Sequence, residues 1–294
     1  MGSLPYRSRI RRARVHRRRP SPASTPLIAL PLPPAPVPTA QLLVGAGAAL
    51  LAGFVNAIAG GGTLLTFPAL VAAGLTPLTA NATSTVALLP GALSSMLGYR
   101  GELTGARRWA ALFAVPSLLG GAFGAALLLH TPSAAFDRIV PWLVLGATAL
   151  FLAQRPLLRM VRGARDHPGD DLLVARPPSA GLLVGQLVVG VYGGYFGAGI
   201  GILMLAALSI LGLTDIHEMN SLKVVFGGTI NGIAAAYFIW AGMVYWPDVL
   251  VMAVGAILGG WGGAGTARRM GRTTVRRIVI AIGLGMALSL FIKK

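Results

Sequence analysis

The chain has 294 residues, a mean hydropathy of +0.73 and 11% charged residues, whereas soluble domains average about 25%. This composition excludes a soluble globular protein and indicates a membrane protein. There is no cysteine, which excludes disulfides and thiol chemistry, and the four histidines are scattered, so we expect neither a metal site nor a cofactor. The net charge of +17 does not indicate nucleic-acid binding, because most basic residues lie in an N-terminal tail and in loops between apolar segments.

Residues 1–40 form a segment of their own. A basic run extends from Arg7 to Arg19, and a Pro-rich stretch follows from Pro20 to Pro38. Proline at this density does not permit a spanning helix, and the apolar part is too short and too broken for a good signal peptide. We expect a disordered basic tail without a role in transport. Its positive charge suits contact with anionic lipid.

From residue 41 the chain is a series of long apolar segments. No charged residue lies between Leu42 and Tyr99 or between Gly181 and Thr214, and a bilayer is spanned by about 20 residues. The predicted helices are 41–59, 63–73, 80–99, 109–129, 139–153, 180–197, 200–211, 219–241, 247–265 and 277–292. Glycine-rich breaks separate the first pair at Gly60–Gly62 and a later pair at Gly197–Gly201. We therefore expect an all-α polytopic membrane protein with about eight transmembrane helices, two of them Gly-broken.

The chain repeats itself in two halves. Gly53–Leu65 resembles Gly190–Ile202, Ala-Gly-Leu-Thr at 73–76 resembles Leu-Gly-Leu-Thr at 211–214, and Asn81 then matches Asn220. Later Gly pairs, at 120–121 and 259–260, also correspond. We expect a first transmembrane repeat over 41–153, a charged cytoplasmic linker over 154–178 and a second repeat over 179–294.

The halves are either parallel or inverted, and charge weighs on the choice. If each broken stretch crosses once, loop 266–277 lies opposite loop 154–178, against the positive-inside rule. If each broken stretch enters and returns, loops 100–108, 154–178 and 266–277 share one face, although the basic tail then lies on the other. We expect the inverted arrangement, with parallel halves as the alternative.

Four stretches resemble those of a known family: Gly53–Pro68, Ala80–Gly91, Gly193–Gly201 and Leu222-Lys-Val-Val. Asn231 and a Gly-Met-Val-Tyr-Trp-Pro turn at 242–247 follow the last of them. Over about residues 41–292 the chain resembles the TauE/SafE family of exporters of sulfite and organosulfur anions. The resemblance implies a transporter of small anions, and it does not specify the substrate. The first half has no Lys equivalent to Lys223, which puts a two-fold symmetric anion site in doubt.

The two Gly breaks predict where an anion binds. A helix that begins after a break offers free N–H groups and the positive end of its dipole, and glycine lets the backbone approach closely. Paired, Gly-interrupted segments in two halves point to a transporter's substrate site, although glycine also permits tight helix crossing. The expected substrate-binding residues are Asn56, Gly60, Gly61, Gly62, Thr63, Asn81, Thr83, Ser84, Thr85, Gly197, Gly199, Gly201, Asn220, Ser221, Lys223 and Asn231.

Several of these residues have a second interpretation. The small polar side chains would cap helices or bond between them. Lys223 would contact the anion, extend to the interface, or pair with Glu218 or Asp215. Asn231, eight residues further on, is a ligand or a helix–helix hydrogen bonder. No carboxylate lies in mid-membrane, so the sequence assigns neither H⁺ nor Na⁺ as a coupling ion, and it does not assign an oligomeric state.

The sequence thus predicts a secondary transporter of small anions in the cytoplasmic membrane. The resemblance alone implies the direction, export, and the substrates, sulfite or organosulfonates. An importer or permease for another solute on the same scaffold is one alternative, and a membrane assembly protein without transport is another. We expect no enzyme, because no nucleotide-binding loop, catalytic triad or paired-carboxylate motif is present.

Overall fold

The computed structural model describes residues 39–58, 60–98, 107–163, 180–210, 216–266 and 272–292. The chain divides into two units, Met1–Pro36 and Val37–Lys294, and all described residues belong to the second. The expected tail up to residue 38 and the part of the expected linker from 164 to 178 lie outside these residues.

The described residues form helices and turns without a strand, which confirms the all-helical class. Ten helices are described: α1 (Thr39–Ile58), α2 (Thr63–Ala72), α3 (Pro77–Gly98), α4 (Arg107–Leu129), α5 (Ser133–Gly163), α7 (Ala180–Tyr195), α8 (Ile200–Ile210), α9 (Ile216–Trp240), α10 (Trp246–Thr266) and α11 (Arg272–Ile292). Each of the ten predicted segments overlaps one of them. α5 is longer than the predicted 139–153 at both ends, because it begins at Ser133 and continues to Gly163 in the charged connection, and α11 begins before the predicted residue 277.

Three helical stretches are long and apolar enough to cross a membrane: Trp109–Leu129, Ser133–Ala153 and Glu218–Trp240. Shorter apolar helices accompany them, among them α2, α7 and α8. Many large apolar side chains are exposed on the outside of the bundle, such as Phe123, Leu250 and Trp261. Apolar side chains both in the interior and on the surface are typical of a protein that is surrounded by lipid.

Both breaks have the same backbone geometry. Gly60 and Gly197 have φ angles of +71° and +74°, which residues with a side chain rarely adopt. Each donates its N–H to the carbonyl five residues back, Gly60 to Val55 at 3.2 Å and Gly197 to Tyr192 at 3.1 Å. This conformation ends α1 and α7 and lets α2 and α8 start in a new direction.

Helices α1 and α10 pack side by side, and so do α4 and α7. Both contacts are made through glycines. A Cβ on Gly53 would overlap the backbone of Ala256, and one on Gly124 would overlap that of Val191. Small residues permit this approach of two backbones, which substitutes for the hydrophobic effect between helices in lipid.

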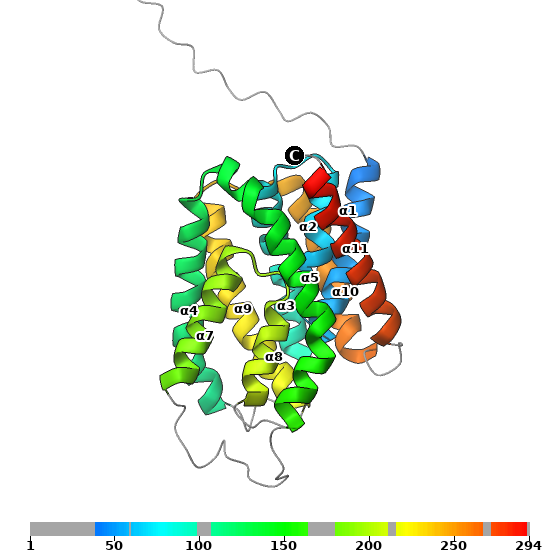
Figure 1. Ribbon diagram of the computed structural model, residues 1–294. Coiled ribbons are helices and arrows are strands. Elements are labelled where there is room, and N and C mark those ends of the chain that lie inside the picture. Colours follow the sequence, from blue (N-terminus) through cyan, green and yellow to red (C-terminus); the bar gives the residue numbers. More distant parts are fainter. Residues whose placement is uncertain are drawn as a thin grey trace, which may run out of the picture. The chain divides into compact units, whose positions relative to one another are not determined.

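The remaining helices surround the breaks. α3 packs against α9 and α10, and α4 packs against α9, so α3 and α9 lie at the centre of the packing (Figure 1). α5 runs past both breaks: Phe151 lies beside Gly61, and Ala147 lies beside Gly199. The described fold therefore brings the two glycine-rich segments to the middle of the bundle.

Candidate substrate site

The two breaks touch each other. A Cβ added to Gly60 would lie 2.5 Å from the Cα of Gly201, so the backbones meet without a side chain between them. These residues are 141 positions apart in the sequence and come from the two predicted halves. The contact places the start of α8 against the end of α1.

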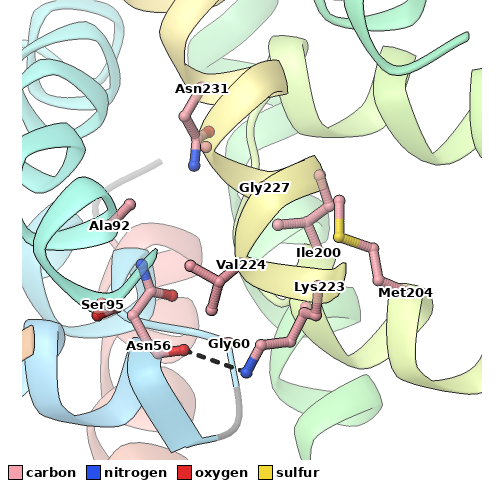
Figure 2. A pocket seen from close by; sticks show the side chains of 12 residues that line it. Asn56, Gly60, Ala92, Ser95, Ile200, Met204, Lys223, Val224, Gly227 and Asn231 are labelled. Atoms are coloured by element: carbon pink, nitrogen blue, oxygen red, sulfur yellow. Dashed lines mark hydrogen bonds between the residues drawn. The ribbon is translucent and has the colours of Figure 1, made fainter. Parts of the chain in front are cut away.

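A small pocket of about 40 Å³ opens beside this contact. Its walls come from α1, the first break, α3, α8 and α9, as Figure 2 shows. The twelve lining residues are Asn56, Gly60, Ala92, Ser95, Ile200, Gly201, Met204, Lys223, Val224, Gly227, Gly228 and Asn231. Five of them, Asn56, Gly60, Gly201, Lys223 and Asn231, are residues that the sequence predicts for the site.

Asn56 holds the first break in shape. Its Oδ1 accepts the N–H groups of Gly61 at 3.1 Å and Gly62 at 3.3 Å, which are donors that the start of α2 leaves unpaired. The Nδ2 donor of the same carboxamide has no acceptor among the residues that the structure describes. One end of Asn56 is therefore structural, and the other end can donate to a ligand in the pocket.

Lys223 is buried, with 3% of its surface exposed, so it does not extend to the interface. Its Nζ donates to the backbone carbonyls of Asn56 and Ala57, both at 3.3 Å, and to Asn220 Oδ1 at 3.0 Å. The two carbonyls lie at the negative end of the α1 dipole. These three acceptors are all neutral, and the pairing with Glu218 that the sequence leaves open is not formed; Asp215 lies outside the described residues.

Asn231 is half-buried and lies at the other end of the pocket from Lys223 (Figure 2). No residue in the described ranges forms a hydrogen bond with its side chain. A Cβ on Gly197 would come within 3.7 Å of Asn231 Oδ1, so this amide also faces the second break. A half-buried carboxamide without a partner is available to a ligand.

The polar cluster of the first half lies outside the pocket lining, and its hydroxyls bind protein atoms. Thr66 Oγ1 and Ser84 Oγ are 2.6 Å apart, and Thr83 Oγ1 accepts the N–H of Tyr245 at 3.0 Å. Thr85 Oγ1 donates to the Asn81 carbonyl at 2.9 Å, and Asn81 Nδ2 donates to the Tyr195 carbonyl at 3.0 Å. In this conformation the Thr66–Ser84 pair joins α2 to α3, and Asn81 joins α3 to α7. Thr83 binds the turn before α10, and the Thr85 hydroxyl bonds within α3.

The other predicted residues surround the pocket without lining it. Gly61 and Gly62 are buried in the first break, and Gly197 and Gly199 lie in the second. Thr63 begins α2, and Asn220 contacts the pocket only through Lys223. Ser221 is fully buried and donates to the Glu218 carbonyl at 2.8 Å.

Seven lining residues are absent from the sequence prediction: Ala92, Ser95, Ile200, Met204, Val224, Gly227 and Gly228. The Gly227-Gly228 pair could have been predicted from the sequence. Glycines within a long helix lower its stability, so their presence there indicates a role in packing or function. A Cβ on either glycine would meet no atom within 4 Å, so both border open space. The apolar side chains have no such signal, since they resemble any other core residue.

Within the described part of the chain, no three His, Cys, Asp or Glu side chains come together as a metal site. The donors that converge on the pocket are Lys223 and two carboxamides, Asn56 and Asn231. Such donors bind the oxygens of an anion, while the pocket wall formed by Ile200, Met204 and Val224 is apolar.

Comparison with known proteins gives consistent results. The family model described as sulfite exporter TauE/SafE matches residues 45–290. A probable membrane transporter protein of Haemophilus influenzae is 32% identical over 240 residues, covering 80% of this chain and 89% of the relative.

Two further relatives match over similar lengths. The probable membrane transporter protein ORF9 of a Sinorhizobium species is 29% identical, covering 83% of this chain and 89% of its own. The probable membrane transporter protein YfcA of Escherichia coli K12 is 28% identical, covering 82% and 86%. No solved structure matches the chain.

Proposed function

The chain belongs to the sulfite exporter TauE/SafE family of membrane transporters, and from this premise we propose that it is a secondary transporter that exports small anions, sulfite or organosulfonates, across the cytoplasmic membrane. The observation that supports this most is the pocket where the two glycine breaks meet. A buried lysine and two carboxamides with a free donor line it.

The pocket residues replace water around an anion. Lys223 brings a positive charge that no acidic side chain in the described structure neutralises, and it lies close to Asn56 at one end of the pocket. Asn56 Nδ2 and the Asn231 amide add directed donors. Asn56 is held in place by its bonds to the first break, so its free donor requires little reorganisation to bind. Of the remaining predicted site residues, the glycines support this set by shaping the two breaks, and Asn220 supports it by accepting a hydrogen bond from Lys223.

We further propose that the protein crosses the membrane many times and consists of two inverted halves. The packing supports this when α1–α5 are matched in order with α7–α11. The contact between α1 and α10 then corresponds to that between α7 and α4, and the contact between α2 and α11 corresponds to that between α8 and α5. In Figure 1, α1 starts on the side where α11 ends, whereas α7 starts and α8 ends on the opposite side. In this arrangement α1–α2 and α7–α8 each enter the membrane and return.

Flux of labelled sulfite from proteoliposomes that contain the purified protein tests the proposal. We expect saturable flux that sulfonates inhibit and that carboxylates do not. Absence of flux with sulfite, thiosulfate, sulfate and every sulfonate, from folded protein, would reject the substrate class. Flux toward the cytoplasmic side only, scored by the orientation of the protein in the vesicles, would instead make it an importer.

A further inference from the structure

The two broken helices end in different ways, although their positions correspond. At the end of α1, the carbonyls of Asn56 and Ala57 receive the ammonium of Lys223, and Asn220 Oδ1 supplies its third acceptor. A cation thus neutralises the negative end of the α1 dipole. Asn220 matches Asn81 of the first half, so the end of α7 can be compared with it atom by atom.

At the end of α7 there is no lysine. Ser84 occupies the position that corresponds to Lys223, and its hydroxyl is paired with Thr66 Oγ1 at 2.6 Å. The carbonyls of Gly193 and Gly194, which correspond to those of Asn56 and Ala57, receive no hydrogen bond from any described residue. The negative end of α7 therefore has no cation from the described structure.

Asn81 adds an oxygen to this helix end. Its Nδ2 donates to the Tyr195 carbonyl at 3.0 Å, while its Oδ1 is buried and has no hydrogen-bond partner. The residue is 1% exposed, so the unpaired acceptor lies in the interior. In the second half the matching atom, Asn220 Oδ1, accepts a hydrogen bond from a cation. A buried acceptor without a donor is explained by a bound group, a hydrogen-bond donor or a cation, that interacts with its lone pair.

We propose that a sodium ion binds at the end of α7, with Asn81 Oδ1 and the last carbonyls of α7 as its ligands, in the place that the Lys223 ammonium takes at the end of α1. All of these ligands are neutral oxygens, whereas calcium and magnesium sites are built with carboxylates. Unwound carbonyls and the ends of half-helices are the groups that coordinate Na⁺ in transporters with broken helices.

Sodium at this position has a consequence for transport, which rests on the proposed function. α7 leads into the second break, and Gly201 of that break contacts Gly60 beside the anion pocket. The ion would set the conformation of the break and so link its own binding to that of the anion. Binding of the ion itself does not depend on which solute is carried.

The test is the thermal unfolding of the purified full chain in detergent, followed by tryptophan fluorescence, in NaCl, KCl and choline chloride at equal concentrations. A ligand that binds only the folded state raises the midpoint in a saturable manner. We expect this response with Na⁺ and not with K⁺ or choline. Equal midpoints in the three salts would overturn the proposal.

Variants assign the response to the site. Asn81→Ala should remove the Na⁺ response, and the matched Asn220→Ala should keep it. If Asn81→Ala does not fold, Asn81→Asp decides, because the added charge should lower the half-saturating Na⁺ concentration at least about tenfold, which corresponds to 1.4 kcal/mol. A response that either Asn81 variant leaves unchanged would overturn the assignment. A Na⁺ response in a protein that moves no anion would overturn the proposed function and not the sodium site.

Discussion

Lys223 has two tasks at one nitrogen atom. It caps the end of α1 with two carbonyl bonds, and it is the cation of the pocket. The three acceptors use all the donors of an ammonium group, so an anion would share this group with α1. Structural and functional effects of replacing Lys223 therefore have to be separated by the choice of variant.

Lys223→Ala should abolish flux and lower stability by about 1–3 kcal/mol, because it removes the hydrogen bonds that the Asn56 and Ala57 carbonyls accept from the ammonium group. Lys223→Gln keeps amide donors and removes the charge, so it should recover part of the stability and none of the flux. Thermal unfolding and sulfite flux in proteoliposomes measure the two effects. Normal flux of Lys223→Gln would show that the charge is not required.

Asn231→Leu should lower the sulfite flux without lowering the unfolding midpoint. The Asn231 amide has no partner among the described residues, and replacing an unpaired polar group by an apolar one of similar shape is neutral or stabilising. We expect an unfolding midpoint at or above that of the parent protein, with flux reduced at least tenfold. A large drop in the midpoint would support the other interpretation, a hydrogen bond between helices.

Helix α9 supplies five of the twelve residues that line the pocket, and Gly227 and Gly228 are two of them. A Cβ on either residue would meet no atom within 4 Å, so a side chain can begin there without a clash and extend into the pocket. Gly61 is a predicted site residue that does not line the pocket, and Gly61→Leu is a poorer choice. A Cβ on Gly61 lies 2.8 Å from the Phe151 ring, so that variant would perturb folding and flux together.

Gly227→Leu should block flux while the helix keeps or gains stability, since leucine is the better helix former by about 1 kcal/mol. Gly185→Leu on α7 is the matched control, because that glycine is exposed on the outside and also borders open space. Flux and the unfolding midpoint are measured for both. Equal flux in the two variants would place the substrate path elsewhere.

The helices and their breaks could be predicted from the sequence because apolar runs and glycines are local signals. Gly60 and Gly197 stand where the chain needs a positive φ, which no other residue provides as readily. The contacts of Lys223 could not be predicted, since its partners Asn56 and Ala57 are more than 160 positions away. Thr83 and Ser84 were equally ambiguous, because hydroxyls that bind a ligand and hydroxyls that join helices look alike in a sequence.

At the scale of the whole molecule, the proposed inverted arrangement predicts which side each connection faces. Helices α3 and α4 join through one Arg-containing connection and α10 and α11 through another, and the positive-inside rule assigns both to the cytoplasm. The turn between α9 and α10, at Ala241, should face the other side. Charge and helix order thus lead to one testable topology.

Single cysteines at Thr104, Thr273 and Ala241 test this topology, because the chain has no cysteine of its own. We expect a membrane-impermeant thiol reagent to label positions 104 and 273 from the same side and position 241 from the opposite side of oriented vesicles. Labelling of 104 and 273 from opposite sides would support parallel halves.

The backbone contact between Gly60 and Gly201 also has a mechanical consequence. With no side chain between them, the two breaks are in direct backbone contact, so a displacement of one would push on the other without a rotamer change in between. We therefore expect the two breaks to move together during transport. Fluorescent reporters on α2 and α8 should then relax at a single common rate after a substrate jump, and two distinct rates would show that the breaks move separately.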